Sequence, residues 1–238
     1  MDLDSFDKLL VDELDIKPVK FPHTSGYCSS CKKAKHPQLE AAGSGHESCL
    51  HYSLQTEGLV SKDSFGATAL HIAARKGMTQ SLQCIVDVCS PVEAFRAHNK
   101  ASPAHDAAGT GNLESLIFLI ENTACTAHDR DKNQATPLHW AAQLGHTEVV
   151  DWLISDAGAQ PDVKNTAGLT PIHLAASKNK LDTLKWLSNH LKNHYVNSQT
   201  YIDARALNGE TPLYFAAQEG HLQIVTWLVE KVCPVIDV

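Results

Sequence analysis

One short motif recurs five times in this 238-residue chain, and this recurrence constrains the fold more than any other feature. The motif reads TALHIAARKG at Thr68–Gly77, SPAHDAAGTGN at Ser102–Asn112, TPLHWAAQLGH at Thr136–His146, TPIHLAASKNK at Thr170–Lys180 and TPLYFAAQEGH at Thr211–His221. Self-similarity at a fixed period is typical of a solenoid, in which stacked repeats bury a core that no single repeat can bury. Equivalent positions in successive repeats are therefore expected to lie above one another.

The spacing of the motif predicts the number and kind of repeats. The first four copies are 34 residues apart and the fifth follows after 41, which predicts a seven-residue insertion between Trp186 and Asn208. A weaker copy, HPQLEAAGSGH at His36–His46, brings the expected number of repeats to six. The TPLHxA pattern at this period resembles the ankyrin repeat. The resemblance implies an all-α solenoid of about six helix-turn-helix repeats with β-hairpin loops.

Each motif residue has a mechanical role in such a repeat. Thr136 can cap the first helix, and Pro137 suits the first helical position, where its missing N–H costs nothing. Ala141 and Ala142 allow close helix contact, and Gly145 suits the left-handed turn that ends a helix. The second helix then carries an apolar stripe of Val149, Val150, Leu153 and Ile154. Neighbouring repeats must cover this stripe.

We divide the chain into three regions: an extension over 1–35, a repeat domain over 36–232 and a tail over 233–238. In the extension, apolar residues recur at helical spacing between acids, which predicts a short amphipathic helix over residues 3–14. This segment is either a solubilising tail or a peptide that docks in a groove, of this chain or of a partner. Residues 17–35 are basic and are expected to form a flexible linker.

Composition indicates a cytoplasmic protein. Hydrophobic residues make up 43% of the chain, but no apolar run is long enough to span a membrane. The opening residues MDLDSFDKLL are acidic where a secretion signal is basic. The odd number of cysteines, seven, fits a reducing compartment. The formal net charge of −7 argues against nucleic acid as a partner.

Cysteine and histidine pairs near residue 40 allow a zinc interpretation. Cys28-x2-Cys31 is followed by His46-x2-Cys49 at a distance typical of zinc fingers. However, His46 and Cys49 also fit the first repeat, at the positions of His146 and Val149. The alternatives are therefore a structural zinc site and a free CxxC pair at the surface. We expect the second, with no metal and no cofactor.

Four histidines occupy one template position: His71, His105, His139 and His173. A buried histidine at such a position is expected to hydrogen-bond backbone groups of its own or the next hairpin. No nucleophile with a matching base, phosphate loop or carboxylate pair stands out elsewhere. We therefore expect that the protein is not an enzyme.

A second ladder lies on the expected outer helices, at Tyr52, Cys84, Phe118, Trp152, Trp186 and Trp227. These residues are interpreted as packing between repeats or, alternatively, as a second protein-binding face.

The binding groove of a solenoid is expected along the hairpin tips and the outward positions of the first helices. The candidate residues are Phe65, Ile72, Asn99, Asp106, Asn133, Trp140, Leu144, Leu169, Leu174, Tyr214 and Phe215. Asp106 is exceptional because the other repeats have apolar residues at its position. Its carboxylate requires a hydrogen bond or a cation. The alternatives are a bond to backbone or a neighbouring histidine, and a contact with Lys or Arg of a bound peptide.

Two stretches, SPAHDAAGTGNLESL and TPLYFAAQEGHLQIV, are similar to repeats of the espins, a family of actin-bundling proteins. The similarity covers roughly residues 37–232, and PAHDA at Pro103–Ala107 is its most distinctive part. In that family the ankyrin array binds the tail of class III myosins and can be masked by an internal segment. The resemblance implies that Asp106, Tyr214 and the groove residues around them contact the partner.

This chain also departs from the family. The similarity does not cover the first 35 residues, Asn179 replaces an expected glycine, and no basic actin-bundling module follows KVCPVIDV. Actin bundling by this chain alone is therefore not implied.

We expect a non-catalytic scaffold, associated with the actin cytoskeleton through its partners, that docks a peptide of a myosin tail or another cytoskeletal protein. Residues 3–14 are a candidate for docking within the chain. The alternatives are direct attachment to actin filaments through residues 17–35 and a generic ankyrin adaptor unrelated to actin.

Overall fold

The structure, a computed structural model, describes residues 26–59, 61–89, 95–194 and 201–232. Within these ranges the repeats form six helix-turn-helix pairs. The first helices of the pairs are α3 (Pro37–Ser44), α5 (Ala69–Lys76), α7 (Pro103–Thr110), α9 (Pro137–Leu144), α11 (Pro171–Ser177) and α14 (Pro212–Gln218). The second helices are α4 (Glu47–Glu57), α6 (Thr79–Cys89), α8 (Leu113–Asn122), α10 (Thr147–Ser155), α12 (Leu181–His194) and α15 (Leu222–Val232).

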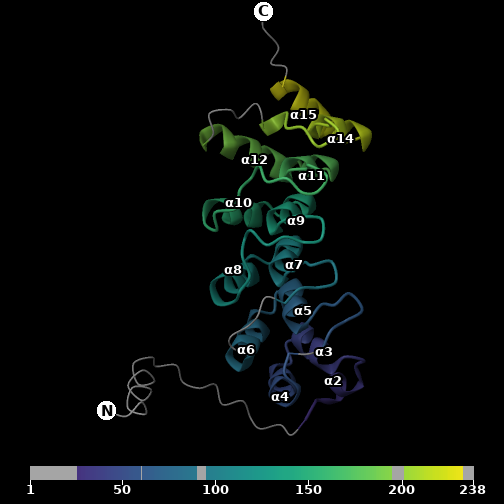
Figure 1. Cartoon of the computed structure of the whole chain (residues 1–238), viewed down its shortest axis with the longest axis vertical. Helices are drawn as coiled ribbons and strands as arrows, with labels where there is room; N and C mark the ends of the chain where they lie inside the picture. Colours follow the sequence, from purple (N-terminus) through teal and green to yellow (C-terminus); the bar gives the residue numbers. More distant parts are fainter. Residues whose placement is uncertain (1–25, 60, 90–94, 195–200, 233–238) are drawn as a thin grey trace, which may run out of the picture.

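The pairs stack into an elongated solenoid (Figure 1). The first helices follow one another in a single column, and α4, α6, α8, α10 and α12 form a second column beside it. Loops project from the first column, away from the second. The expected all-α solenoid of about six repeats is confirmed.

The loops are tighter than the expected β-hairpins. In the loop before α9, the Asp131 N–H donates to the Ala135 carbonyl at 3.0 Å, and the Gln134 N–H donates to the Asp131 carbonyl at 3.0 Å. Within the described residues the only bridge of β type joins Lys62 and Thr68. Each loop is therefore a closed turn that is too short to form strands.

Paired alanines allow the first helices to pack closely. Ala141 and Ala142 of α9 are fully buried, as are the equivalent pairs in α3, α5, α7 and α11. The second helices supply larger side chains, such as Leu119 of α8 and Leu153 of α10, which are also fully buried. Burial of each such leucine contributes about 1.5–3 kcal/mol, so stability accumulates from one repeat to the next.

The ends of the first helices follow the motif. Thr136 precedes α9 with extended backbone, and Pro137 is the first helical residue. Gly145 ends α9 with φ of 87°, in the left-handed region that favours glycine. In the fifth repeat Asn179 takes this role with φ of 58°, since asparagine tolerates that region better than other side chains.

The template histidines tie each repeat to the next. His139 Nδ1 accepts the N–H of Thr136 at 3.1 Å, and its Nε2 lies 3.1 Å from the Leu169 carbonyl. The backbone donor at Nδ1 places the ring proton on Nε2, which therefore donates to the next loop. His71 and His105 make the same contacts, to the carbonyls of Ala101 and Ala135. The expected structural role is confirmed for these three histidines.

The insertion affects the fifth repeat. α12 has 14 residues, whereas the other second helices have 9 to 11. Residues 195–200 lie outside the described ranges, and the chain is no longer helical at residues 204–206. His173 Nε2 is buried without a hydrogen-bond partner among the described residues, although its counterparts bond the following loop.

A further helix, α2 (Ser29–Lys33), precedes the first repeat and packs against α3. It lies in the stretch for which a flexible linker was expected. Cys31 of α2 is fully buried, and Cys28, which caps the helix, is exposed. The expected surface CxxC pair is thus half wrong, because α2 folds back onto the repeat. The amphipathic helix expected over residues 3–14 and the tail over 233–238 lie outside the described residues.

The outer ladder packs between repeats. Phe118, Trp152, Trp186 and Trp227 are half-buried against the core of the second helices. No helix within the described ranges combines the length and the hydrophobicity that a membrane span requires.

Candidate functional site

A pocket of about 470 Å³ opens on the loop side of the solenoid, where α5, α7 and α9 follow one another. We call it the Trp140 pocket. Its lining residues, from two successive loops and three first helices, are Ser64, Phe65, Ala67, Arg75, Ala97, His98, Asn99, Ala101, Asp106, Gly109, Thr110, Trp140 and Leu144. The pocket therefore spans three consecutive repeats.

The structure brings together only part of the expected groove. Phe65, Asn99, Asp106, Trp140 and Leu144 line the Trp140 pocket. The other candidates do not line it; these are Ile72, Asn133, Leu169, Leu174, Tyr214 and Phe215.

Three of these other candidates serve contacts between repeats. Ile72 is half-buried and packs against α3, where a Cβ at Gly43 would lie 2.8 Å from its Cγ2. The Leu169 carbonyl accepts the bond from His139 described above. The Asn133 carbonyl accepts the N–H of Thr166 in the next loop at 2.9 Å.

The remaining candidates lie farther along the solenoid. Leu174 is half-buried on α11. Tyr214 and Phe215 lie on α14, with their rings edge to face at 5.7 Å, and Phe215 also meets the His173 ring at 6.0 Å. Tyr214 is 51% exposed, so it offers an aromatic surface away from the Trp140 pocket.

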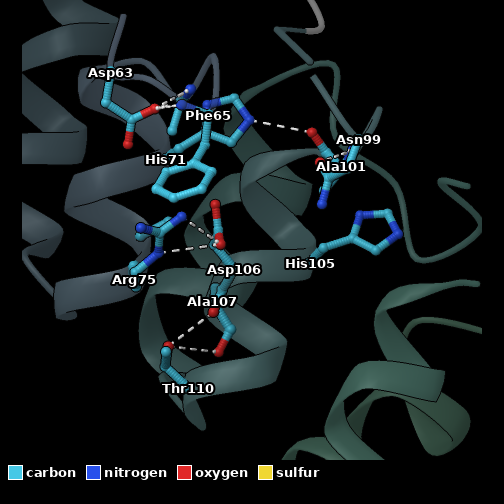
Figure 2. A network of polar contacts seen from close by, with 12 residues as sticks. Asp63, Phe65, His71, Arg75, Asn99, Ala101, His105, Asp106, Ala107 and Thr110 are labelled. Atoms are coloured by element: carbon cyan, nitrogen blue, oxygen red, sulfur yellow. Dashed lines mark hydrogen bonds and ion pairs between the residues drawn. The ribbon is translucent and has the colours of Figure 1, made fainter. Parts of the chain in front are cut away.

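An ion pair forms part of the pocket wall. Arg75 Nε and Nη2 lie 3.2 and 3.0 Å from Asp106 Oδ1, so the two side chains point toward one another across α5 and α7 (Figure 2). The Asp106 side chain is 8% exposed and that of Arg75 is 39% exposed. Burial raises the pKa of Asp106 above its ordinary value, and the positive charge of Arg75 acts in the opposite direction. The charge that a ligand can reach is therefore mainly that of Arg75.

This pair changes the interpretation of Asp106. Its carboxylate is paired with a cation of the chain itself, because Arg75 donates two hydrogen bonds to Oδ1, and no bond to a neighbouring histidine is seen among the described residues. Sequence reasoning named Asp106 and missed Arg75 as its partner. A signal was present: the residue after each template histidine packs on the preceding first helix, as Trp140 does on Gly109, 31 residues earlier. The same offset separates Asp106 from Arg75.

Trp140 is held in one orientation. Its Nε1 donates to Asp131 Oδ2 at 3.2 Å, and its ring meets the His105 ring edge to face at 5.4 Å. A Cβ at Gly109 would lie only 3.0 Å from Trp140 Cε3, so the absence of a side chain at Gly109 allows the ring to pack against α7. A side chain fixed on both sides loses little entropy when a ligand packs against it.

Phe65 forms a more exposed part of the pocket wall. It is 71% exposed at the tip of its loop. Asp63 Oδ1 accepts the N–H groups of Phe65 and Ala67 at 2.8 and 2.9 Å, which closes the loop. The Phe65 carbonyl also accepts the His98 N–H at 2.8 Å, so successive loop tips are joined by backbone hydrogen bonds. An exposed aromatic side chain thus stands on a rigid loop.

Neutral histidines lie beneath the loops. Burial lowers the pKa of His71 and of His139 to about 4, and it also lowers the pKa values of His105 and His173. These rings are therefore uncharged at neutral pH and engaged in structural contacts. The groups that could hold a metal lie elsewhere: within the described part of the chain, the one cluster of three or more ligand groups is formed by Cys28, Cys31 and Cys49 beside α2.

Comparison with known families covers most of the chain. The family model described as ankyrin repeats, in three copies, matches residues 39–127, 76–165 and 157–237. No curated protein matches the chain.

Proposed function

Because the chain belongs to the ankyrin-repeat family, whose repeats mediate contacts between proteins, we propose that it is a scaffold that binds a peptide segment of a partner protein in the Trp140 pocket. Ankyrin-repeat proteins are generally non-catalytic adaptors, and the proposal assigns this role to the present chain. The observation that carries it is an open pocket with exposed apolar walls on rigid supports. Loop tips and first helices are also where solenoids place their binding surfaces.

The walls favour an apolar anchor. Phe65 and Leu144 are 71% and 48% exposed, and Trp140 lines the same pocket. Large apolar side chains that remain exposed gain the most when a partner covers them. We infer that the partner inserts an aromatic or aliphatic side chain between Phe65, Trp140 and Leu144.

Arg75 favours a hydrogen-bond acceptor beside that anchor. Its guanidinium has N–H groups beyond those bound to Asp106, and it is the more exposed member of the pair. A carbonyl or carboxylate of the partner can accept from it without disturbing Asp106. The expected ligand is therefore an apolar residue flanked by an acceptor, in place of the basic residue that Asp106 alone would favour.

The identity of the partner is proposed from the sequence resemblance. The similarity to espins makes a class III myosin tail segment the first candidate, and it would place the protein at actin bundles in the cytoplasm. Direct attachment to actin through residues 17–35 stays a prediction, and residues 17–25 of that segment lie outside the described residues. The same holds for docking of residues 3–14 in the pocket. The acidic net charge argues against nucleic acid as a partner, and a membrane is not expected as a partner because the chain has no long apolar run.

Truncating the apolar walls should abolish most of the binding. We expect the double variant Phe65→Ala/Leu144→Ala to bind the myosin tail segment, or peptides selected on the full chain from a displayed library, at least about 30-fold more weakly. A central apolar anchor typically contributes about 2 kcal/mol or more. Both side chains are exposed, so the fold should persist. Fluorescence anisotropy with labelled peptide measures the affinity, and circular dichroism checks the fold.

Leu222→Ala is the matched control, because Leu222 is 75% exposed on α15 and lies outside the pocket. Its affinity should equal that of the unmodified chain. An unchanged affinity in the double variant would exclude the Trp140 pocket as the binding site. A third outcome would remove the myosin assignment and leave the pocket: the selected peptides bind the unmodified chain and lose affinity for the double variant, whereas the myosin segment binds neither protein.

A further inference from the structure

Three thiols and an imidazole meet at the N-terminal end of the solenoid. The Sγ atoms of Cys28, Cys31 and Cys49 all lie within 4.8 Å of one another. His46 Nδ1 lies 3.6 Å from Cys28 Sγ and 3.0 Å from Cys31 Sγ. Two of these residues come from α2 and its first flanking position, and two from the start of α4. None of them contributes to the Trp140 pocket.

We propose that Cys28, Cys31, His46 and Cys49 bind one Zn²⁺ ion in a tetrahedral Cys3His site. Zinc lies about 2.3 Å from sulfur and about 2.0–2.1 Å from histidine nitrogen, which gives tetrahedral edges of about 3.8 Å between sulfurs and about 3.5 Å from sulfur to nitrogen. The two distances from His46 Nδ1 to sulfur, 3.6 and 3.0 Å, lie on both sides of the sulfur–nitrogen edge, and the three sulfurs lie within 4.8 Å of one another. Closing the shell requires side-chain rotations that bring His46 Nδ1 and the three sulfurs to these edges.

The pattern of ligands in the sequence fits the same metal. Cys28-x2-Cys31 and His46-x2-Cys49 are the short pairs by which structural zinc sites are built, and four protein ligands leave no open position for catalysis. Binding converts the three thiols to thiolates and releases their protons to solvent. Three thiolates, a neutral histidine and Zn²⁺ carry a net charge of −1.

The surroundings balance that charge. The Cys28 N–H lies 3.2 Å from Cys49 Sγ, and the Cys31 N–H lies 3.5 Å from Cys28 Sγ, so backbone donors face two of the sulfurs. Lys32 and Lys33 occupy the last turn of α2. Such outer contacts orient ligands and stabilise their charged form.

A metal also explains how α2 is held. α2 has five residues, too few to be stable as an isolated helix. In the other repeats a closed loop precedes the first helix, and in the first repeat α2 takes the position of that loop. The first repeat has Leu39 at the position of the template histidine, so the usual bond from ring to backbone is absent there. The zinc site would fasten α2 over the first repeat as a cap, which the terminal repeats of solenoids require.

This inference reverses the expectation of no metal. That expectation rested on the fact that His46 and Cys49 occupy regular positions of the repeat and so needed no metal to explain them. The structure gives both residues those places and also brings them to the two cysteines of α2, so the two explanations are compatible.

Metal content and cobalt spectroscopy test the site. The full chain, freed of any affinity tag and kept reduced, should purify with close to one zinc per chain by elemental mass spectrometry. Replacing zinc by Co²⁺ should give the intense visible absorption bands of tetrahedral cobalt. It should also give a near-ultraviolet band from charge transfer between thiolate and cobalt. Cys49→Ser should weaken zinc binding at least about 100-fold, since even outer-shell losses typically cost 10–100-fold.

Cys89→Ser is the matched control, because Cys89 is a half-buried thiol of α6 outside the cluster. It should retain one zinc and the tetrahedral spectrum. Equal zinc content in Cys49→Ser and the unmodified chain, or a weak octahedral cobalt spectrum in the unmodified chain, would overturn the proposal. The cobalt spectrum of the unmodified chain decides the question even if Cys49→Ser fails to fold.

Discussion

Replacing His139 by alanine is expected to lower the free energy of unfolding by about 3–5 kcal/mol, because one ring joins two repeats. The ring is fully buried. Its Nδ1 accepts the Thr136 N–H, and its Nε2 donates to the Leu169 carbonyl. Alanine strands both backbone groups, each at a cost of about 1–3 kcal/mol, and it also leaves a cavity.

Urea denaturation followed by far-ultraviolet circular dichroism measures this loss. His128→Ala is the control, since His128 is exposed in the loop between α8 and α9 and should change stability by no more than about 0.5 kcal/mol. A loss below about 1 kcal/mol in His139→Ala would contradict the role assigned to the histidine ladder, because it is less than one stranded backbone group costs.

The same histidines are expected to make the protein sensitive to mild acid. Burial lowers the pKa of His71 and His139 to about 4 in the folded chain, whereas an unfolded histidine titrates near about 6.5. Between these values the unfolded state binds more protons, so stability falls as the pH falls. The slope is up to about 1.4 kcal/mol per pH unit for each such histidine.

Other groups modify the slope without reversing it. His105 and His173 are shifted in the same direction by burial. The raised pKa of Asp106 has the opposite effect, because its contribution to the free energy of unfolding is lost as the pH rises. This is one group, whereas four histidines are shifted in the other direction. The lowered pKa of Asp129 adds to acid loss only near and below its ordinary pKa.

Thermal and urea unfolding between pH 7.5 and pH 5 tests this expectation. The unmodified chain should lose stability continuously below about pH 6.5. His139→Gln, which cannot titrate, should show a slope smaller by up to about 1.4 kcal/mol per pH unit. Stability that is constant or rises on acidification over this range would show that the buried rings are not held neutral.

Much of the fold could be predicted because the repeat makes local chemistry and global position coincide. Proline has one favoured place in a helix, which is the first turn. The recurrence of proline therefore predicts where the first helix starts in the third to sixth repeats, as Pro137 does for α9. The buried role of His139 followed from the same recurrence. The conformation of the loops could not be predicted in the same way, because a turn of five residues can close with or without flanking β-strands.

The candidate site was predicted in part because binding residues depend on contacts between repeats. Asp106 stood out as an exception within its column, but its partner Arg75 lies in another column and is found only from the offset between stacked helices. Leu169 was assigned to the groove by its column, and its carbonyl instead serves His139. The burial of Cys31 depends on α2 folding back, a long-range event that no repeat period encodes.

Hydrogen exchange of the full chain, with and without a bound peptide, tests most directly whether the loop side binds partners. The peptide would be one selected on the full chain. We expect slower exchange at the loop tips around Phe65 and Asn99 and along α5, α7 and α9, with little change in α8, α10 and α12. Slower exchange confined to α8, α10 and α12 would place binding on the outer aromatic ladder and contradict the account.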